Sequence, residues 1–133
     1  MKRLLHLLRV QIFLLVMVFP IVSQAVVINE IRVDQPSSDD DEYFELAGTP
    51  GQDLTGLFYL VIGDGTGGSG VIEAVVDLTG IQIAPDGFLL VGESTMSIAT
   101  PDLISSLNFE NSDNVTHLLV SGFTGSNGDD LDT

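Results

Sequence analysis

Short apolar runs, separated by turn-forming residues, recur along most of the chain. Seven runs rich in Val, Ile, Phe and Tyr are expected to form strands, at residues 26–33, 42–47, 57–62, 71–76, 81–84, 88–91 and 116–120. In the second run, Phe44 and Leu46 alternate with Tyr43 and Glu45. Successive side chains of a strand point to opposite faces, so this alternation predicts one buried and one solvated face. The run at 71–76 alternates in the same way, which places Glu73 on the solvated face.

Gly, Pro, Asp and Ser concentrate between these runs, at 35–38, 48–51, 63–70 and 85–87. Such residues favour the backbone dihedrals of tight connections. Residues 94–114 are less regular, and we expect a long loop there with at most one helical turn. The pattern predicts an all-β fold of about seven to eight short strands, arranged as an immunoglobulin-like β-sandwich. A small β-barrel is the competing architecture.

The first 25 residues have the order of a secretory signal peptide. Three bases, Lys2, Arg3 and Arg9, precede an uncharged apolar stretch at 10–22. Small residues follow at Ser23 and Ala25, the positions that a signal peptidase reads, which predicts a cut before residue 26. An uncleaved membrane anchor is the alternative. We therefore expect residues 1–25 to be a helical signal peptide and residues 26–124 a sandwich domain. Residues 125–133 are expected to be an acidic C-terminal tail, or alternatively the start of a truncated calcium-binding region.

Charge is distributed very unevenly along the chain. All 19 acidic residues lie at or after Glu30, where Arg32 is the single base. Nucleic-acid affinity comes chiefly from Lys and Arg that displace counterions, so we expect no nucleic-acid binding through this domain. Anionic lipid would repel the domain too, so we expect no membrane association after signal cleavage. The chain has no cysteine, so its stability must come from its core alone.

Two acidic groups are candidates for a calcium site. The four consecutive acids before the second predicted strand repel one another and would gain from a counter-cation. Near the C-terminus, Asp130 and Asp132 have the spacing with which a calcium loop begins. Calcium takes six to eight oxygen ligands and is the candidate cation outside cells. The candidate ligands are Asp39, Asp40, Asp41, Glu42, Asp130 and Asp132. The alternatives are a solvated acidic turn and a frayed tail.

Other motifs in the sequence indicate ordinary structure. Residues 63–68 satisfy G-x-G-x-x-G, but a β-branched run follows instead of a helix, so a hairpin loop is expected there. His117 is the only histidine after the leader, and it is expected to decorate a strand. No G-x-S-x-G elbow is present, and with 19 acids a carboxylate pair carries no information about glycoside hydrolysis. We expect no enzymatic activity and no cofactor other than calcium.

Four segments, in this order, resemble the lamin tail domain of secreted bacterial proteins. They are Val-Ile-Asn-Glu-Ile at 27–31, Glu-Tyr-Phe-Glu-Leu at 42–46, Asp-Leu-Thr-Gly-Leu at 53–57 and Ile-Ala-Pro-Asp-Gly-Phe-Leu-Leu-Val at 83–91. The resemblance covers residues 26–92. It implies an immunoglobulin-like sandwich without catalytic residues. It also implies that Asn29 and Glu30 are structural and connect the first strand to its neighbour through side-chain hydrogen bonds.

These observations predict a secreted or cell-surface module with a structural, adhesion or binding role. We expect it to be part of a larger extracellular protein and to bind a protein or carbohydrate surface. The resemblance also allows an alternative, the N-terminal accessory domain of an extracellular metal-dependent hydrolase of the nuclease or phosphoesterase type, whose catalytic domain is expected beyond residue 133. A calcium-stabilised adhesin domain is a third possibility.

Overall fold

The computed structural model describes residues 24–33, 38, 40–64, 68–107, 109 and 114–132, and these residues contain strands and no helix. The all-β prediction is therefore confirmed for them. The strands are β1 (Val27–Arg32), β2 (Tyr43–Ala47), β3 (Leu57–Gly63), β4 (Val71–Asp77), β5 (Phe88–Gly92), β6 (Leu103–Ile104) and β7 (Thr116–Ser121). The predicted leader lies outside the described residues, apart from Gln24 and Ala25.

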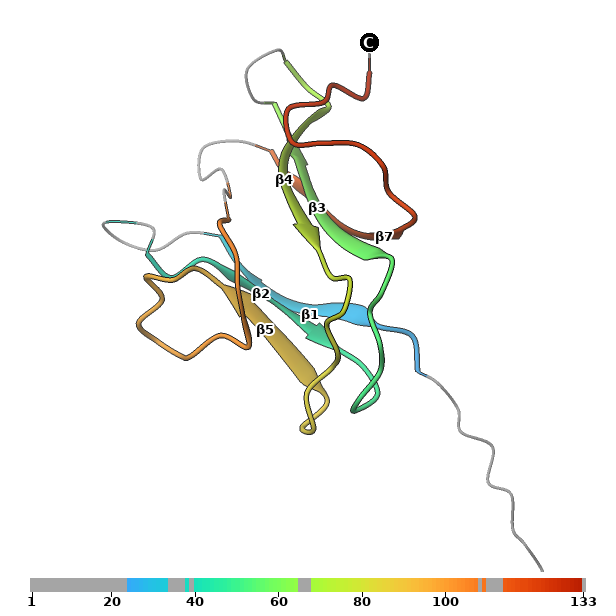
Figure 1. Cartoon of the computed structure of the whole chain (residues 1–133). Coiled ribbons are helices and arrows are strands. Elements are labelled where there is room, and N and C mark those ends of the chain that lie inside the picture. The colour runs from blue at the N-terminus through green and yellow to red at the C-terminus, as the bar shows by residue number, and fades with distance from the viewer. Residues whose placement is uncertain are drawn as a thin grey trace, which may run out of the picture.

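The strands form two sheets, which Figure 1 shows as two layers running in different directions. The first sheet has the order β1-β2-β5-β6, and the second has the order β4-β3-β7. Neighbouring strands are antiparallel except β5 and β6, which are parallel. Consecutive β3 and β4 form a hairpin, whereas β2 and β5 are brought together from distant parts of the chain. The two sheets thus depend on long-range pairing.

The core lies between the two sheets and is centred on an aromatic stack. The rings of Phe44 on β2 and Tyr59 on β3 lie 3.6 Å apart at an interplanar angle of 4°, and neither side chain is exposed. Around this stack, apolar side chains from both sheets are buried. They include Leu46, Leu89 and Val91 from the first sheet and Val61, Ala74 and Val76 from the second. The predicted alternation in β2 is confirmed, since Tyr43 and Glu45 lie on the opposite face from Phe44.

The structure differs from the sequence prediction in the two short segments around β5. Residues 81–84 form no strand, and only Gln82 makes an isolated bridge, to Asp53. Ile83 is nevertheless buried, and its amide donates to the Gln52 carbonyl at 3.0 Å. The side chain of Ile83 therefore belongs to the core, although its backbone lies in a connection and not in a strand. Conversely, the predicted long loop contains β6, whose two residues pair with β5, and its described part has no helical turn.

Glu73 is buried, contrary to the simple alternation of β4. Its side chain is 7% exposed. The register between β3 and β4 shifts after Val61, which pairs with Ala74, while the next residue of β3 pairs with Ile72. Glu73 is the extra residue of this bulge, and a bulge re-aims the side chain at its position. Gly63 makes the room, because a Cβ there would overlap the Glu73 carboxylate.

Residues 122–132, which we call the strap, return from β7 to the start of β4 (Figure 1). Phe123 packs edge-on against Phe58 of β3, with ring centroids 5.8 Å apart. Further along, the Ile72 amide donates to the Asp129 carbonyl at 2.9 Å, and Gly128 donates back to Ile72 at 2.7 Å. The strap therefore covers the first residues of the free edge of β4 and belongs to the folded unit. The described residues after Thr124 are therefore not a frayed tail.

We expect a chain that ends at Thr124 to lose about 2–6 kcal/mol of unfolding free energy. It lacks three backbone hydrogen bonds to Gly70 and Ile72 and the side-chain bond from Asn127 to the Glu73 carbonyl, each contributing about 0.5–1.5 kcal/mol. Urea unfolding measures the loss. As a control, Asn127→Ala removes one of these bonds and is expected to cost about 1 kcal/mol. Equal midpoints for the truncated and full chains would contradict a structural role for the strap.

Candidate functional site

The predicted acidic cluster before β2 is divided by the structure. Asp39 lies outside the described residues, and Asp40 is exposed. Asp41 and Glu42 are 9% and 6% exposed, so their carboxylates are turned into the protein. Only one described member of the cluster therefore faces solvent.

The two buried carboxylates hold distant loops against the first sheet. Asp41 accepts hydrogen bonds from the backbone amide and the hydroxyl of Ser97. The bond from the Ser97 amide lowers the pKa of the Asp41 carboxyl from its ordinary value. Glu42 accepts a bond from the Phe109 amide at 3.2 Å. Both side chains thus act as anchors for the chain between β5 and β7.

The second predicted calcium group lies on the other sheet. Asp130 forms a bridge with Val71, at the start of β4, and its carboxylate accepts the Asp132 amide at 3.1 Å. Asp132 in turn accepts a bond from the Ser69 hydroxyl at 3.1 Å. Across the part of the chain that the structure describes, no three acidic or imidazole groups gather so that they could hold a metal ion. Calcium binding stays a prediction from the sequence.

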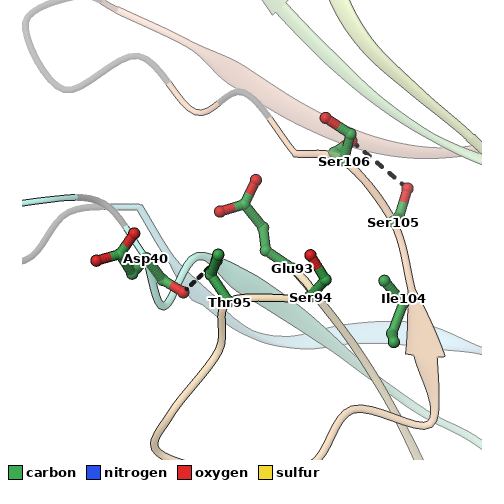
Figure 2. A pocket seen from close by; sticks show the side chains of 7 residues that line it. All are labelled: Asp40, Glu93, Ser94, Thr95, Ile104, Ser105 and Ser106. Atoms are coloured by element: carbon green, nitrogen blue, oxygen red, sulfur yellow. Dashed lines mark hydrogen bonds between the residues drawn. The ribbon is translucent and has the colours of Figure 1, made fainter.

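A pocket of about 330 Å³, which we call the end pocket, opens at one end of the first sheet. Figure 2 shows the three segments that form it, which are the chain before β2, the turn after β5, and β6 with the residues that follow it. Its lining is Asp40, Glu93, Ser94, Thr95, Ile104, Ser105 and Ser106. The Thr95 hydroxyl donates to the Asp40 carbonyl at 2.9 Å and ties two of the segments together. Carboxylates and hydroxyls side by side can accept and donate hydrogen bonds to a polar ligand.

A second pocket, which we call the face pocket, lies on the outer face of the first sheet and has a volume of about 270 Å³. Its floor is formed by strand residues and its wall by the loop after β5. The lining residues are Glu30, Tyr43, Glu45, Leu90, Met96, Ile98 and Ala99. Two carboxylates, one phenol ring and an aliphatic wall therefore share one cavity.

Asn29 and Glu30 have the role that the family resemblance implies. The Asn29 side-chain amide donates to Glu45 Oε1 at 2.6 Å, and the Tyr43 hydroxyl donates to Glu30 Oε1 at 2.7 Å. Both bonds connect β1 to β2, so this prediction is confirmed. The bond to Glu30 raises the pKa of the Tyr43 hydroxyl. The carboxylates of Glu30 and Glu45 also line the face pocket.

His117 lies on β7 beside the core, as a strand residue. Its Nδ1 is 2.8 Å from the Tyr59 hydroxyl, and the Phe109 ring packs edge-on against the imidazole at 5.0 Å. Its Nε2 is buried and has no hydrogen-bond partner among the described residues. Burial lowers the pKa of the His117 imidazole and raises that of the Tyr59 hydroxyl. The contact between Tyr59 and His117 thus connects β3 to β7.

Sequence reasoning missed most residues of both pockets. Glu93, Ser94 and Thr95 lie about 50 residues from Asp40 in the sequence, and only the pairing of β5 with β2 brings them together. The signal that could have found them is the direct transition from a strand into Glu-Ser-Thr, a polar turn at a strand end. Met96 and Ile98 give a further signal, because they are apolar residues in a stretch expected to be a long loop.

Comparisons with protein-family models, with curated proteins and with solved structures give no match to this chain. The described residues also contain no helix of the length and apolarity that crossing a membrane requires. The fold and the two pockets are therefore the basis for a proposal about function.

We expect folding stability to fall as the pH drops below about 6.5, the ordinary pKa of histidine. Because the folded state lowers the pKa of His117, it binds a proton less readily than the unfolded chain. The stability that depends on neutral His117 is complete above that pH and is lost as the pH falls through the lowered pKa. Protonation would place a positive charge in a partly buried site where Nε2 has no hydrogen-bond acceptor among the described residues.

Urea midpoints between about pH 5 and pH 7.5 measure this effect, compared with His117→Gln, which does not titrate. The paired carboxyls with lowered pKa, such as Asp53 and Asp77, lose their contribution only below about pH 4. The variant should therefore have a flatter profile in this range. Parallel profiles for the two proteins would contradict the role of His117.

Proposed function

We propose that this chain is a secreted or cell-surface module that binds an extracellular partner, a protein or carbohydrate surface, and belongs to a larger extracellular protein. The observation that carries the proposal is the end pocket. It is built by loops at one end of a packed pair of sheets, and such loops are the usual binding surfaces of sandwich domains. Its hydroxyls and carboxylates suit a ligand rich in hydrogen-bonding groups.

The strand order supports the finer proposal of an immunoglobulin-like sandwich. In that fold, strands A, B and E are neighbours in one sheet, and strands C and F are neighbours in the other, with C′ beside C in variable-type domains. Here β1, β2 and β5 match A, B and E, and β4, β3 and β7 match C′, C and F. β6 takes the place of strand D but is parallel to β5.

The positions of the four signature segments support membership of the lamin tail family. The first two segments coincide with β1 and β2, which pair with each other. The third, at 53–57, is the turn that leads into β3, and the fourth forms the turn and strand β5 beside β2. The signature therefore gathers on the first sheet and its connection to the second, as expected of residues that specify one fold.

Export is tested by sequencing the N-terminus of the secreted product after expression with the leader. We expect it to begin at Val26, because Gln24 and Ala25 are exposed and irregular and leave the bond after Ala25 open to a peptidase. Ala25→Phe should abolish the cut, because the peptidase requires a small residue there, while Gln24→Ala should leave it unchanged. Retention of the unprocessed chain in the cytoplasm would contradict the proposed location.

Binding through the end pocket is tested with a substitution that fills it. Ser94 is exposed and lines the pocket, so Ser94→Trp should block ligand access without disturbing the core. We expect at least a fivefold loss of retention of the labelled secreted protein on a glycan array and on intact producing cells. The control is Thr100→Trp, on an exposed position of the same loop outside both pockets. Equal retention of the two variants would exclude the end pocket as the binding site.

A further inference from the structure

The outer face of the first sheet carries an exposed apolar strip interrupted by two carboxylates. One cross-strand row consists of Val27, Ala47 and Phe88. Val27 and Phe88 are 48% and 40% exposed. The next row pairs Glu30 with Glu45, and Glu45 with Leu90. Apolar patches rimmed by polar groups are typical of interaction sites.

The loop after β5 turns this flat face into a cavity. Met96, Ile98 and Ala99 form the wall of the face pocket, and Ile98 is 54% exposed. Ser97, at the centre of this wall, is held by Asp41 through two hydrogen bonds. The volume of about 270 Å³ is below the roughly 300–1,000 Å³ of pockets for drug-sized ligands. It is suited to one long side chain.

Glu30 and Glu45 lie directly opposite each other across β1 and β2. Like charges in this position are destabilising. Each Oε1 accepts a hydrogen bond from a neutral donor, Tyr43 or Asn29, which leaves both charges in place. Among the described residues, neither Oε2 accepts a hydrogen bond, and Arg32 lies one row further along the same face, opposite Tyr43. A cation between the two carboxylates would relieve their repulsion.

We propose that the face pocket binds a lysine or arginine side chain of a partner protein. The cationic head lies between Glu30 and Glu45, and the aliphatic stem packs on Leu90, Met96 and Ile98. The Tyr43 ring adds a cation–π contact. Beyond the first nine residues the chain has Arg32 as its only base, and a basic partner protein can supply the cation for these two carboxylates. The acidic surface also steers a basic partner toward the module.

This inference rests on the proposed binding role, and the experiment separates the two. The ¹⁵N-labelled secreted chain is titrated by NMR with the methylamides of N-acetyl-lysine, N-acetyl-arginine and the uncharged N-acetyl-norleucine. We expect both cationic probes to shift the amides of Tyr43, Leu90 and Ile98, and norleucine to bind at least tenfold more weakly. Binding should weaken as salt is added, because exposed charges are screened.

Glu30→Gln with Glu45→Gln should reduce the affinity for both cationic probes at least tenfold. Gln keeps an acceptor for Tyr43 and Asn29, so the sheet is expected to stay intact. The matched control is Asp53→Asn with Asp77→Asn, which removes the same charge from exposed turn residues and keeps their bonds to Thr55 and Thr79. We expect the affinity of this control to stay within twofold of the parent protein.

Equal binding of norleucine, equal loss in the control pair, or shifts confined to other residues would overturn the inference. So would saturation of the same amides by calcium chloride alone, since a metal ion would then be the ligand. If the probes fail while retention sensitive to Ser94→Trp persists, only the face pocket is wrong. If the probes bind as expected and the chain is neither exported nor retained on any surface, the proposed function is wrong.

Discussion

The arrangement of this molecule depends on the stack of Phe44 on Tyr59. Each ring lies on a strand that has neighbours on both sides, β2 in the first sheet and β3 in the second, so one contact joins the centres of both layers. Tyr59 also reaches His117 on β7 through its hydroxyl. A domain without disulfides must be held by such packing, and buried aromatic pairs contribute about 0.5–1.5 kcal/mol beyond their area.

A chain with so many acids and so few bases must use carboxylates as hydrogen-bond acceptors. Asp53 and Asp77 each accept the amide two residues later and close the turns around β3 and β4. Hydrogen bonds from the Thr55 and Thr79 side chains, together with these amide bonds, lower the pKa of both carboxyls, so the charged forms stabilise the fold. Asp41 and Glu42 accept backbone amides from residues far along the chain, Ser97 and Phe109. Part of the acidic content of this chain therefore serves the fold, because carboxylates accept backbone amides. The prediction of a cation site at residues 39–42 does not include this structural role.

The sequence correctly predicted the features of the fold that depend on the local alternation of apolar and polar residues. Alternation in β2 identified Phe44 and Leu46 as buried, and the family signature identified Asn29 and Glu30 as links between strands. Features that depend on pairing were missed. The bulge that buries Glu73 arises from the register with β3, and the two residues of β6 are extended only because β5 lies beside them. The pockets were missed for the same reason, because their walls come from segments about 50 residues apart.

The loop between β5 and β6 contributes to the lining of both pockets. Ser94 and Thr95 line the end pocket, and Met96 and Ile98, directly after them, line the face pocket. Asp41 fixes this loop at Ser97, close to the middle of that stretch. Because Asp41 holds this loop in place, the walls of both pockets depend on the same hydrogen bond. The Asp41 carboxylate, just before β2, thus positions chain both at the end of the first sheet and on its outer face.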